Sequence, residues 1–119
     1  MLVEHDRLFG EGLALLLEWR TGSGSVRAGS LAEARAILGE TKRQPDCALV
    51  DLDLPKGEGT EVLKELDGVP VVALIRSRDL GRQAEALGLG AEEVLRKGSV
   101  EKIAVAVERL IGSRSIGAF

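Results

Sequence analysis

The stretch Cys47-Ala48-Leu49-Val50-Asp51-Leu52-Asp53-Leu54-Pro55 contains an apolar run that ends abruptly at an aspartate. The apolar run shows no alternation between apolar and polar residues. This is typical of a strand covered by helices on both faces, as in a parallel sheet. We therefore predict a buried strand over 46–51, with Asp51 at its carboxyl end and a turn beginning at residue 52.

Short apolar runs alternate with helical patterns on both sides of this strand. Runs of apolar residues at helical spacing and capping residues such as Ser30, Asp79 and Ser99 mark the helices. The alternation predicts a parallel sheet between two helix layers, with right-handed crossovers. The predicted strands cover 1–3, 26–28, 46–51, 71–75 and 94–95, and the predicted helices cover 8–20, a segment beginning at 30, 60–66, 80–88 and 100–111.

The chain has 119 residues, of which 45% are hydrophobic, and this suits one domain with its own core. We assign residues 1–112 to that domain and 113–119 to a tail or the start of a linker. The net charge of -3, with both signs interspersed, argues against direct nucleic-acid binding by this domain. No run approaches the roughly 20 apolar residues that span a bilayer, and no signal peptide is evident, so we expect a cytoplasmic protein without a membrane partner.

Charged side chains follow three of the predicted strands. Glu4 and His5 follow the first strand, Asp51 ends the third, and Lys97 follows the fifth. Ligands of open parallel sheets bind beyond the carboxyl ends of the strands. Carboxylates are the hard oxygen ligands that Mg²⁺ prefers, and a lysine supplies a point charge for a phosphoryl group or a carboxylate.

These segments resemble the receiver domain of two-component response regulators, most of all receivers that precede a LuxR/NarL-type helix-turn-helix domain. The resemblance rests on residues 2–13, on 48–55 with Gly59, on 70–74, and on 90–91 leading to Lys97. It implies an α/β, flavodoxin-like (βα)5 three-layer sandwich with parallel sheet order 2-1-3-4-5. It also implies a phosphorelay signalling domain that is not an enzyme.

The resemblance further implies a role for each matching position. Asp51 corresponds to the aspartate that takes a phosphoryl group from a histidine kinase or another phosphodonor, and Lys97 to the lysine that contacts the phosphoryl oxygens. Glu4 corresponds to the first of two acidic residues that hold Mg²⁺ together with Asp51, and Asp53 to a position that supplies its backbone carbonyl as a ligand.

Three positions depart from the receiver pattern. His5 stands where the second metal-binding acid belongs, and imidazole is a poor ligand for Mg²⁺. Ile75 stands where a Ser or Thr hydroxyl contacts the phosphoryl group, and Val94 where an aromatic switch residue moves. We therefore expect an atypical receiver with impaired switching and impaired Mg²⁺ binding, and the sequence leaves open whether it binds Mg²⁺ at all.

Several interpretations stay open. The main alternative is a phosphorylation-independent pseudo-receiver that acts as a protein-binding or dimerisation module, with Lys97 paired to Asp51 as a built-in cation. A metal-dependent enzyme is a third interpretation, since Glu4 with Asp51-Leu52-Asp53 also resembles the Toprim metal site and Asp-x-Asp resembles haloacid-dehalogenase phosphatases.

We expect Arg76, Arg78 and Arg82 to form a solvated face. We expect homodimerisation through the last helix and its neighbours, and any DNA binding to belong to a separate domain.

Overall fold

The computed structural model describes residues 1–112, so the predicted tail at 113–119 lies outside the described residues. Strands and helices alternate along the chain as predicted. Their bounds are β1 Leu2–Val3, α1 Arg7–Thr21, β2 Arg27–Ala28, α2 Leu31–Glu40, β3 Ala48–Asp51, a 3₁₀ turn Pro55–Gly57, α3 Glu58–Glu65, β4 Val71–Ile75, α4 Leu80–Gly88, β5 Glu93–Arg96 and α5 Val100–Gly112.

The strands form one parallel sheet in the order β2-β1-β3-β4-β5, which confirms the predicted topology. In the register of the sheet, Val3 of β1 lies beside Val50 of β3, and Asp51 lies beside Leu74 of β4. The carboxyl ends of β1 and β3 are therefore neighbours, which sets the place of the site described below.

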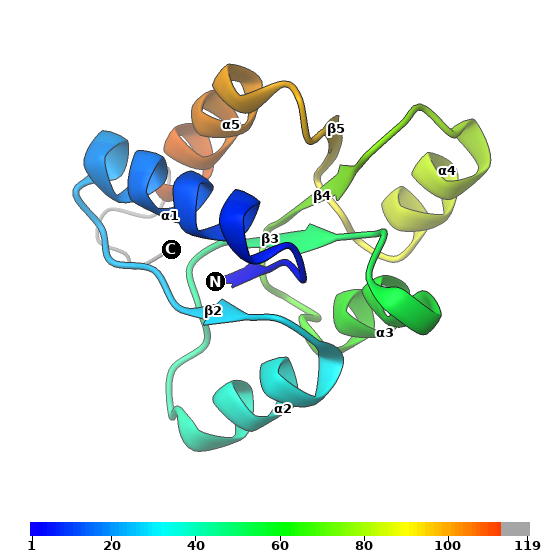
Figure 1. Cartoon of the computed structure of the whole chain (residues 1–119). Coiled ribbons are helices and arrows are strands. Elements are labelled where there is room, and N and C mark those ends of the chain that lie inside the picture. The colour runs from blue at the N-terminus through cyan, green and yellow to red at the C-terminus, as the bar shows by residue number, and fades with distance from the viewer. Residues whose placement is uncertain (113–119) are drawn as a thin grey trace.

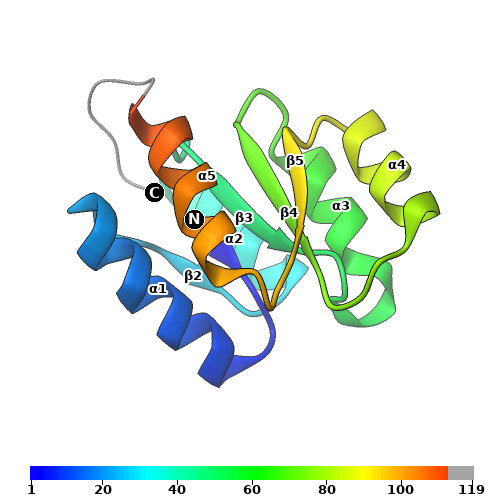
Figure 2. The same cartoon turned by 90° about the horizontal axis from the view of Figure 1, so that it is seen from above.

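Helices cover both faces of the sheet. Figure 1 shows α1 and α5 on one face and α2, α3 and α4 on the other, and Figure 2 shows α1 and α5 side by side from above. Alternate residues of each central strand point to opposite layers: Val50 packs in the core beneath α2, α3 and α4, and Leu49 in the core beneath α1 and α5. This explains the apolar run without alternation, because both faces of the strand are buried.

Side-chain caps fix the starts of three helices. The carboxylate of Asp6 accepts the Phe9 N–H, Ser30 accepts the Glu33 N–H, and Asp79 accepts the Arg82 N–H. Ser30 and Glu33 form a modified capping box, since the Glu33 carboxylate accepts the N–H of Gly29 rather than that of Ser30. Helix α3 begins two residues earlier than predicted because the turn at 55–57 leads directly into it.

Within residues 1–112, we find no helix with the length and apolar character required to cross a bilayer.

Candidate functional site

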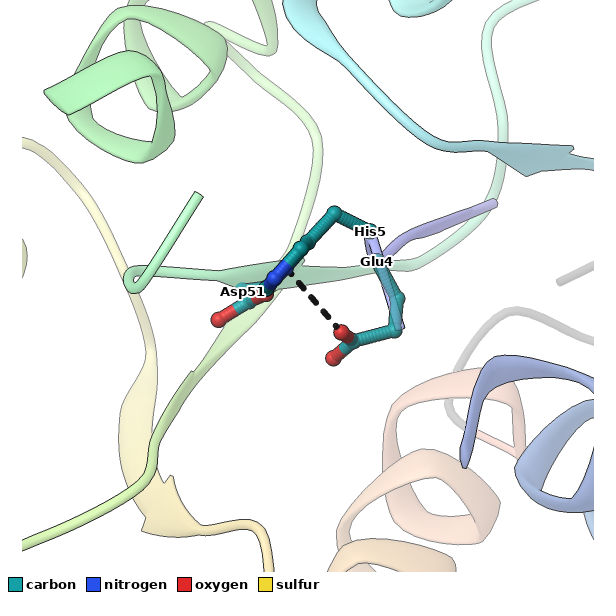
Figure 3. Close-up of side chains that lie close together, drawn as sticks. All are labelled: Glu4, His5 and Asp51. Carbon is teal, nitrogen blue, oxygen red and sulfur yellow. Dashed lines mark hydrogen bonds and ion pairs between the residues drawn. The ribbon is translucent and has the colours of Figure 1, made fainter. Parts of the chain in front are cut away.

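Three strand ends bring the predicted residues together. Glu4 and His5 leave β1, Asp51 ends the adjacent β3, and Lys97 leaves β5 at the same edge of the sheet. Figure 3 shows that the side chains of Glu4, His5 and Asp51 converge. Nδ1 of His5 lies 2.9 Å from Oδ2 of Asp51 and 3.6 Å from Oε2 of Glu4. The convergence that the sequence predicted is thus present.

The carboxylate of Asp51 has partners on both oxygens. The residue is fully buried at 0% exposure. Its Oδ1 accepts the backbone N–H of Asp53 at 2.8 Å, and its Oδ2 lies 2.9 Å from His5 Nδ1 and 3.1 Å from Lys97 Nζ. A buried carboxylate is tolerated only when it is paired and hydrogen-bonded, and here both conditions are met.

The Lys97 ammonium bridges the two buried carboxylates. Its Nζ lies 2.9 Å from Oε1 of Glu4 and 3.1 Å from Oδ2 of Asp51, and it also stands 5.5 Å from the centre of the Phe9 ring. Burial alone would lower the pKa of Lys97, but the hydrogen bonds to Glu4 and Asp51 outweigh it and raise that pKa above its usual value. Lys97 therefore carries a firm positive charge at neutral pH.

Glu4 is the other buried carboxylate of the site. Burial raises the pKa of its carboxyl above the usual value, although the backbone N–H of Asp6 and the Lys97 ammonium oppose this shift. Its Oε2 accepts the Asp6 N–H at 2.8 Å and a hydrogen bond from the Lys97 ammonium at 3.1 Å. Its buried Oε1 lies 2.9 Å from the same ammonium but has no hydrogen bond of usual geometry among residues 1–112.

The donor set fits Mg²⁺ only in part. The carboxylates of Glu4 and Asp51 are suitable oxygen ligands, but His5 presents a nitrogen where Mg²⁺ prefers oxygen. The Lys97 ammonium also lies against both carboxylates and compensates their charge. The residues present therefore do not make a well-matched magnesium site.

The two expected switch positions are apolar and packed. Ile75, the last residue of β4, is buried in the core beneath α2, α3 and α4. Val94 of β5 is half-buried and packs against the same core. Neither side chain can donate a hydrogen bond, so neither can sense an added phosphoryl group in that way.

Arg76 and Arg78 are exposed, as expected for a solvated arginine face, whereas Arg82 is only partly exposed and makes specific contacts that the sequence did not predict. Its guanidinium lies 2.5 Å from Oδ1 of Asp53 and also donates to the backbone carbonyl of Leu52. Asp53 Oδ2 accepts the backbone N–H of Arg76 at 2.7 Å. Burial would raise the pKa of Asp53, but Arg82 and the Arg76 N–H outweigh it and lower that pKa below its usual value.

These contacts tie the loop after β3 to the start of α4, and sequence reasoning missed them. Asp79 caps α4 and so places Arg82 in its first turn, where helical side chains point back toward the amino end. The predicted cap at Asp79 was therefore the only sequence feature that indicated where the Arg82 side chain points. It gave no indication of the partner, because Asp53 lies in a different segment.

Comparison with known proteins identifies the family. Residues 1–108 match the family model described as the response regulator receiver domain. Over 66 residues, 53% of this chain, the sequence is 35% identical to the KDP operon transcriptional regulatory protein KdpE of Escherichia coli, and the alignment spans 29% of the length of KdpE.

Solved structures agree with this match. A response regulator receiver protein from Burkholderia phymatum is 29% identical with a TM-score of 0.80, covering 93% of this chain and 92% of that one. A LuxR-family two-component response regulator from Aurantimonas is 26% identical with a TM-score of 0.82, covering 100% of this chain and 86% of that one. The family is one of signalling domains, and the chain belongs to it: it is a response regulator receiver domain.

Proposed function

We propose that this domain is an atypical receiver in which Asp51 accepts a phosphoryl group from a histidine kinase or a small phosphodonor. The observation that supports this most is the pairing of a fully buried Asp51, at the carboxyl end of β3, with the Lys97 ammonium 3.1 Å away. A fixed cation beside the acceptor oxygen stabilises the negative charge that a phosphoryl group brings.

In this proposal a carboxylate oxygen of Asp51 attacks the phosphorus of a phosphohistidine. The new P–O bond makes an acyl phosphate as the P–N bond breaks, and the imidazole leaves after taking up a proton. Lys97 would keep its charge next to the transferred group. Asp51 Oδ2 first has to lose part of its contact with His5 or Lys97, which slows the reaction.

We further propose that phosphorylation changes the conformation of this domain little. The hydroxyl and the aromatic ring that receivers use for switching are replaced by Ile75 and Val94, which are packed in the core. A ligand shifts a conformational equilibrium only through contacts that differ between the two states.

The test is incubation with acetyl phosphate in Mg²⁺ or in Mn²⁺, with intact mass as the readout. We expect slow, partial addition of one phosphoryl group to the wild-type chain and none to Asp51→Asn. Absence of the added mass in both metals, while a conventional receiver is modified in parallel, would contradict the proposal.

A phosphorylation-independent binding module is the second candidate. It is favoured by the complete set of partners already made by Asp51, namely His5, Lys97 and the Asp53 N–H. This candidate predicts that Asp51→Ala leaves partner binding unchanged, whereas the first predicts that the substitution removes any phosphodonor effect on binding.

We propose that the partners include a second copy of this chain, which would pair through the face formed by α4, β5 and α5. Exposed Leu87 of α4 and Val105 of α5 support this, as does the position of β5 at the edge of the sheet. Light scattering should show that Val105→Glu lowers the dimer fraction. Trp19→Glu, on the exposed face of α1, is the control and should leave that fraction unchanged.

We also propose that residues 1–112 act as the receiver and that 113–119 begin a linker to a separate DNA-binding domain. The printed name of KdpE, a transcriptional regulatory protein, and the LuxR-family match support this proposal. Sequencing the gene beyond codon 119 tests it, and a stop codon directly after residue 119 would contradict it.

A further inference from the structure

The cluster of Glu4, His5 and Asp51 is a mixed nitrogen and oxygen donor set. One ligand atom from each residue lies within 4.8 Å of the other two. Both carboxylates are buried, with side chains at most 1% exposed, whereas the His5 side chain is 34% exposed and borders solvent. The cluster thus has two fixed anionic ligands and one side chain that is open to an arriving ion.

The second observation is the buried oxygen Oε1 of Glu4. It has no well-formed hydrogen bond among the described residues, and its charge is compensated by Lys97 Nζ at 2.9 Å. The ammonium compensates the charge of this oxygen without a well-aligned hydrogen bond, and a metal ion in its place would give the oxygen a direct ligand bond.

Donor chemistry then decides which cation fits. Mg²⁺ demands oxygen ligands in near-ideal octahedral geometry, whereas borderline ions such as Mn²⁺, Co²⁺ and Zn²⁺ accept imidazole and carboxylate together. We propose that Glu4, His5 and Asp51 bind a borderline divalent transition-metal ion in preference to Mg²⁺, with His5 as the residue that determines this selectivity.

Binding requires two local rearrangements. The His5 ring must carry its proton on Nε2, so that the Nδ1 lone pair, now facing Asp51, can bind the metal. The Lys97 ammonium must also withdraw from the two carboxylates, because it occupies the position of a competing internal cation. Replacing Lys97 with an uncharged side chain should therefore tighten metal binding.

The composition of the chain makes the test unusually clear. The sequence has one histidine and one cysteine. Cys47 is fully buried just before β3, away from the carboxyl ends of the strands. In a protein without an affinity tag, any metal that binds an imidazole must bind His5.

The experiment titrates the tag-free protein with Co²⁺, Zn²⁺ and Mg²⁺ separately, without a phosphodonor. Calorimetry gives the affinities, and NMR follows the single imidazole. We expect Co²⁺ to shift or broaden the His5 ring signals, and Zn²⁺ to compete with it. His5→Gln should weaken Zn²⁺ binding by about tenfold or more.

His5→Asp is the matched variant, since it supplies the second acid in place of the imidazole. It should tighten Mg²⁺ binding and reduce the ratio of Zn²⁺ to Mg²⁺ affinity by about tenfold or more. Unchanged His5 signals at saturating Co²⁺, or equal Zn²⁺ affinity in His5→Gln and wild type, would overturn the inference. Neither readout depends on phosphorylation of Asp51, so this inference and the proposed function fail separately.

Discussion

The charge balance of the site depends on the ammonium group of Lys97. It is the cation that contacts both buried carboxylates, Glu4 Oε1 at 2.9 Å and Asp51 Oδ2 at 3.1 Å. His5 adds a second contact to Asp51, with Nδ1 2.9 Å from Oδ2. Two carboxylates this close in a buried site would repel each other without the lysine between them.

Lys97→Met should therefore destabilise the fold. Removing one partner of a buried charge pair leaves the other uncompensated, at a cost of about 3 kcal/mol. Adding Asp51→Asn to this variant removes one of the stranded charges and should recover part of the loss. Urea unfolding of the two single variants and the double variant measures the coupling. Additive effects would show that Lys97 and Asp51 do not interact.

The raised pKa of Lys97 adds a dependence on alkaline pH. The stabilisation that Lys97 provides is complete below the ordinary lysine pKa of 10.5 and is lost as the pH rises through the higher folded value. The difference in unfolding free energy between wild type and Lys97→Met should therefore be constant near neutral pH and shrink above 10.5. Thermal unfolding of both proteins across that range measures it, and a difference that stayed constant would contradict the assignment.

At the junction of β3 and α3, the backbone of the helix passes very close to the backbone at the end of the strand. Gly59 lies in the first turn of α3, and a Cβ built there would stand 2.6 Å from the carbonyl oxygen of Asp51 and 2.8 Å from the Cα of Leu52. Any larger residue would push α3 away from the end of β3. The helix and Asp51 are thus positioned together.

Gly59→Ala should cost about 1 to 3 kcal/mol, since it overpacks backbone that cannot move aside. Gly12→Ala is the matched control: Gly12 lies in α1 with open space around its Cα, and alanine there should stabilise the helix by up to about 1 kcal/mol. Thermal unfolding compares the two substitutions. Equal effects of the same sign would show that the contact with β3 is unimportant.

Arg82 links two elements that are distant in sequence, the loop after β3 and helix α4. Arg82→Gln should destabilise the protein by about 1 kcal/mol at neutral pH, because the ion pair with Asp53 is partly exposed. The lowered pKa of Asp53 means that its stabilisation is present above the ordinary value of 3.8 and is lost as the pH falls through the lower folded value. Urea unfolding should therefore show a smaller difference between variant and wild type near pH 3 than near pH 6; a larger difference at the lower pH would contradict this account.

The sheet lies between two hydrophobic cores, and its strands contribute side chains to both. One core lies beneath α2, α3 and α4 and the other beneath α1 and α5, with β3 and β4 contributing to both. Helices α2 and α4 each bury a single residue completely, Ala34 and Ala86, whereas α5 buries four. Stability should therefore be uneven across the protein.

Hydrogen exchange followed by mass spectrometry should reveal this difference. We expect amides of β3, β4 and α5 to exchange slowest, and those of α2 and α4 to exchange first, through local opening. The exposed Gly81 within α4 weakens that helix further. If the amides of β3 exchanged as fast as those of α4, the sheet and α4 would open as one unit, and stability would not be uneven in this way.

The order of elements and the strand residues were predictable because apolar runs and capping residues are local signals. Ser30 and Asp79 cap the helices they were expected to cap. The neighbourhood of Glu4, His5 and Asp51 was also predictable, because it follows from strand order once the family pattern is recognised. Boundaries shifted by one or two residues, as at α3, where a turn leads into the helix, and at β3, which begins at Ala48 rather than at residue 46.

Local sequence patterns and the family resemblance were sufficient to indicate a parallel α/β sheet and the residues at its carboxyl edge. The folded arrangement alone established that Lys97 lies between Glu4 and Asp51, and that Arg82 forms an ion pair with Asp53. The physical reason is the range of the interactions. Hydrophobic periodicity and capping act between residues close in the chain, whereas a charged side chain selects its partner among groups that only folding brings within a few ångströms.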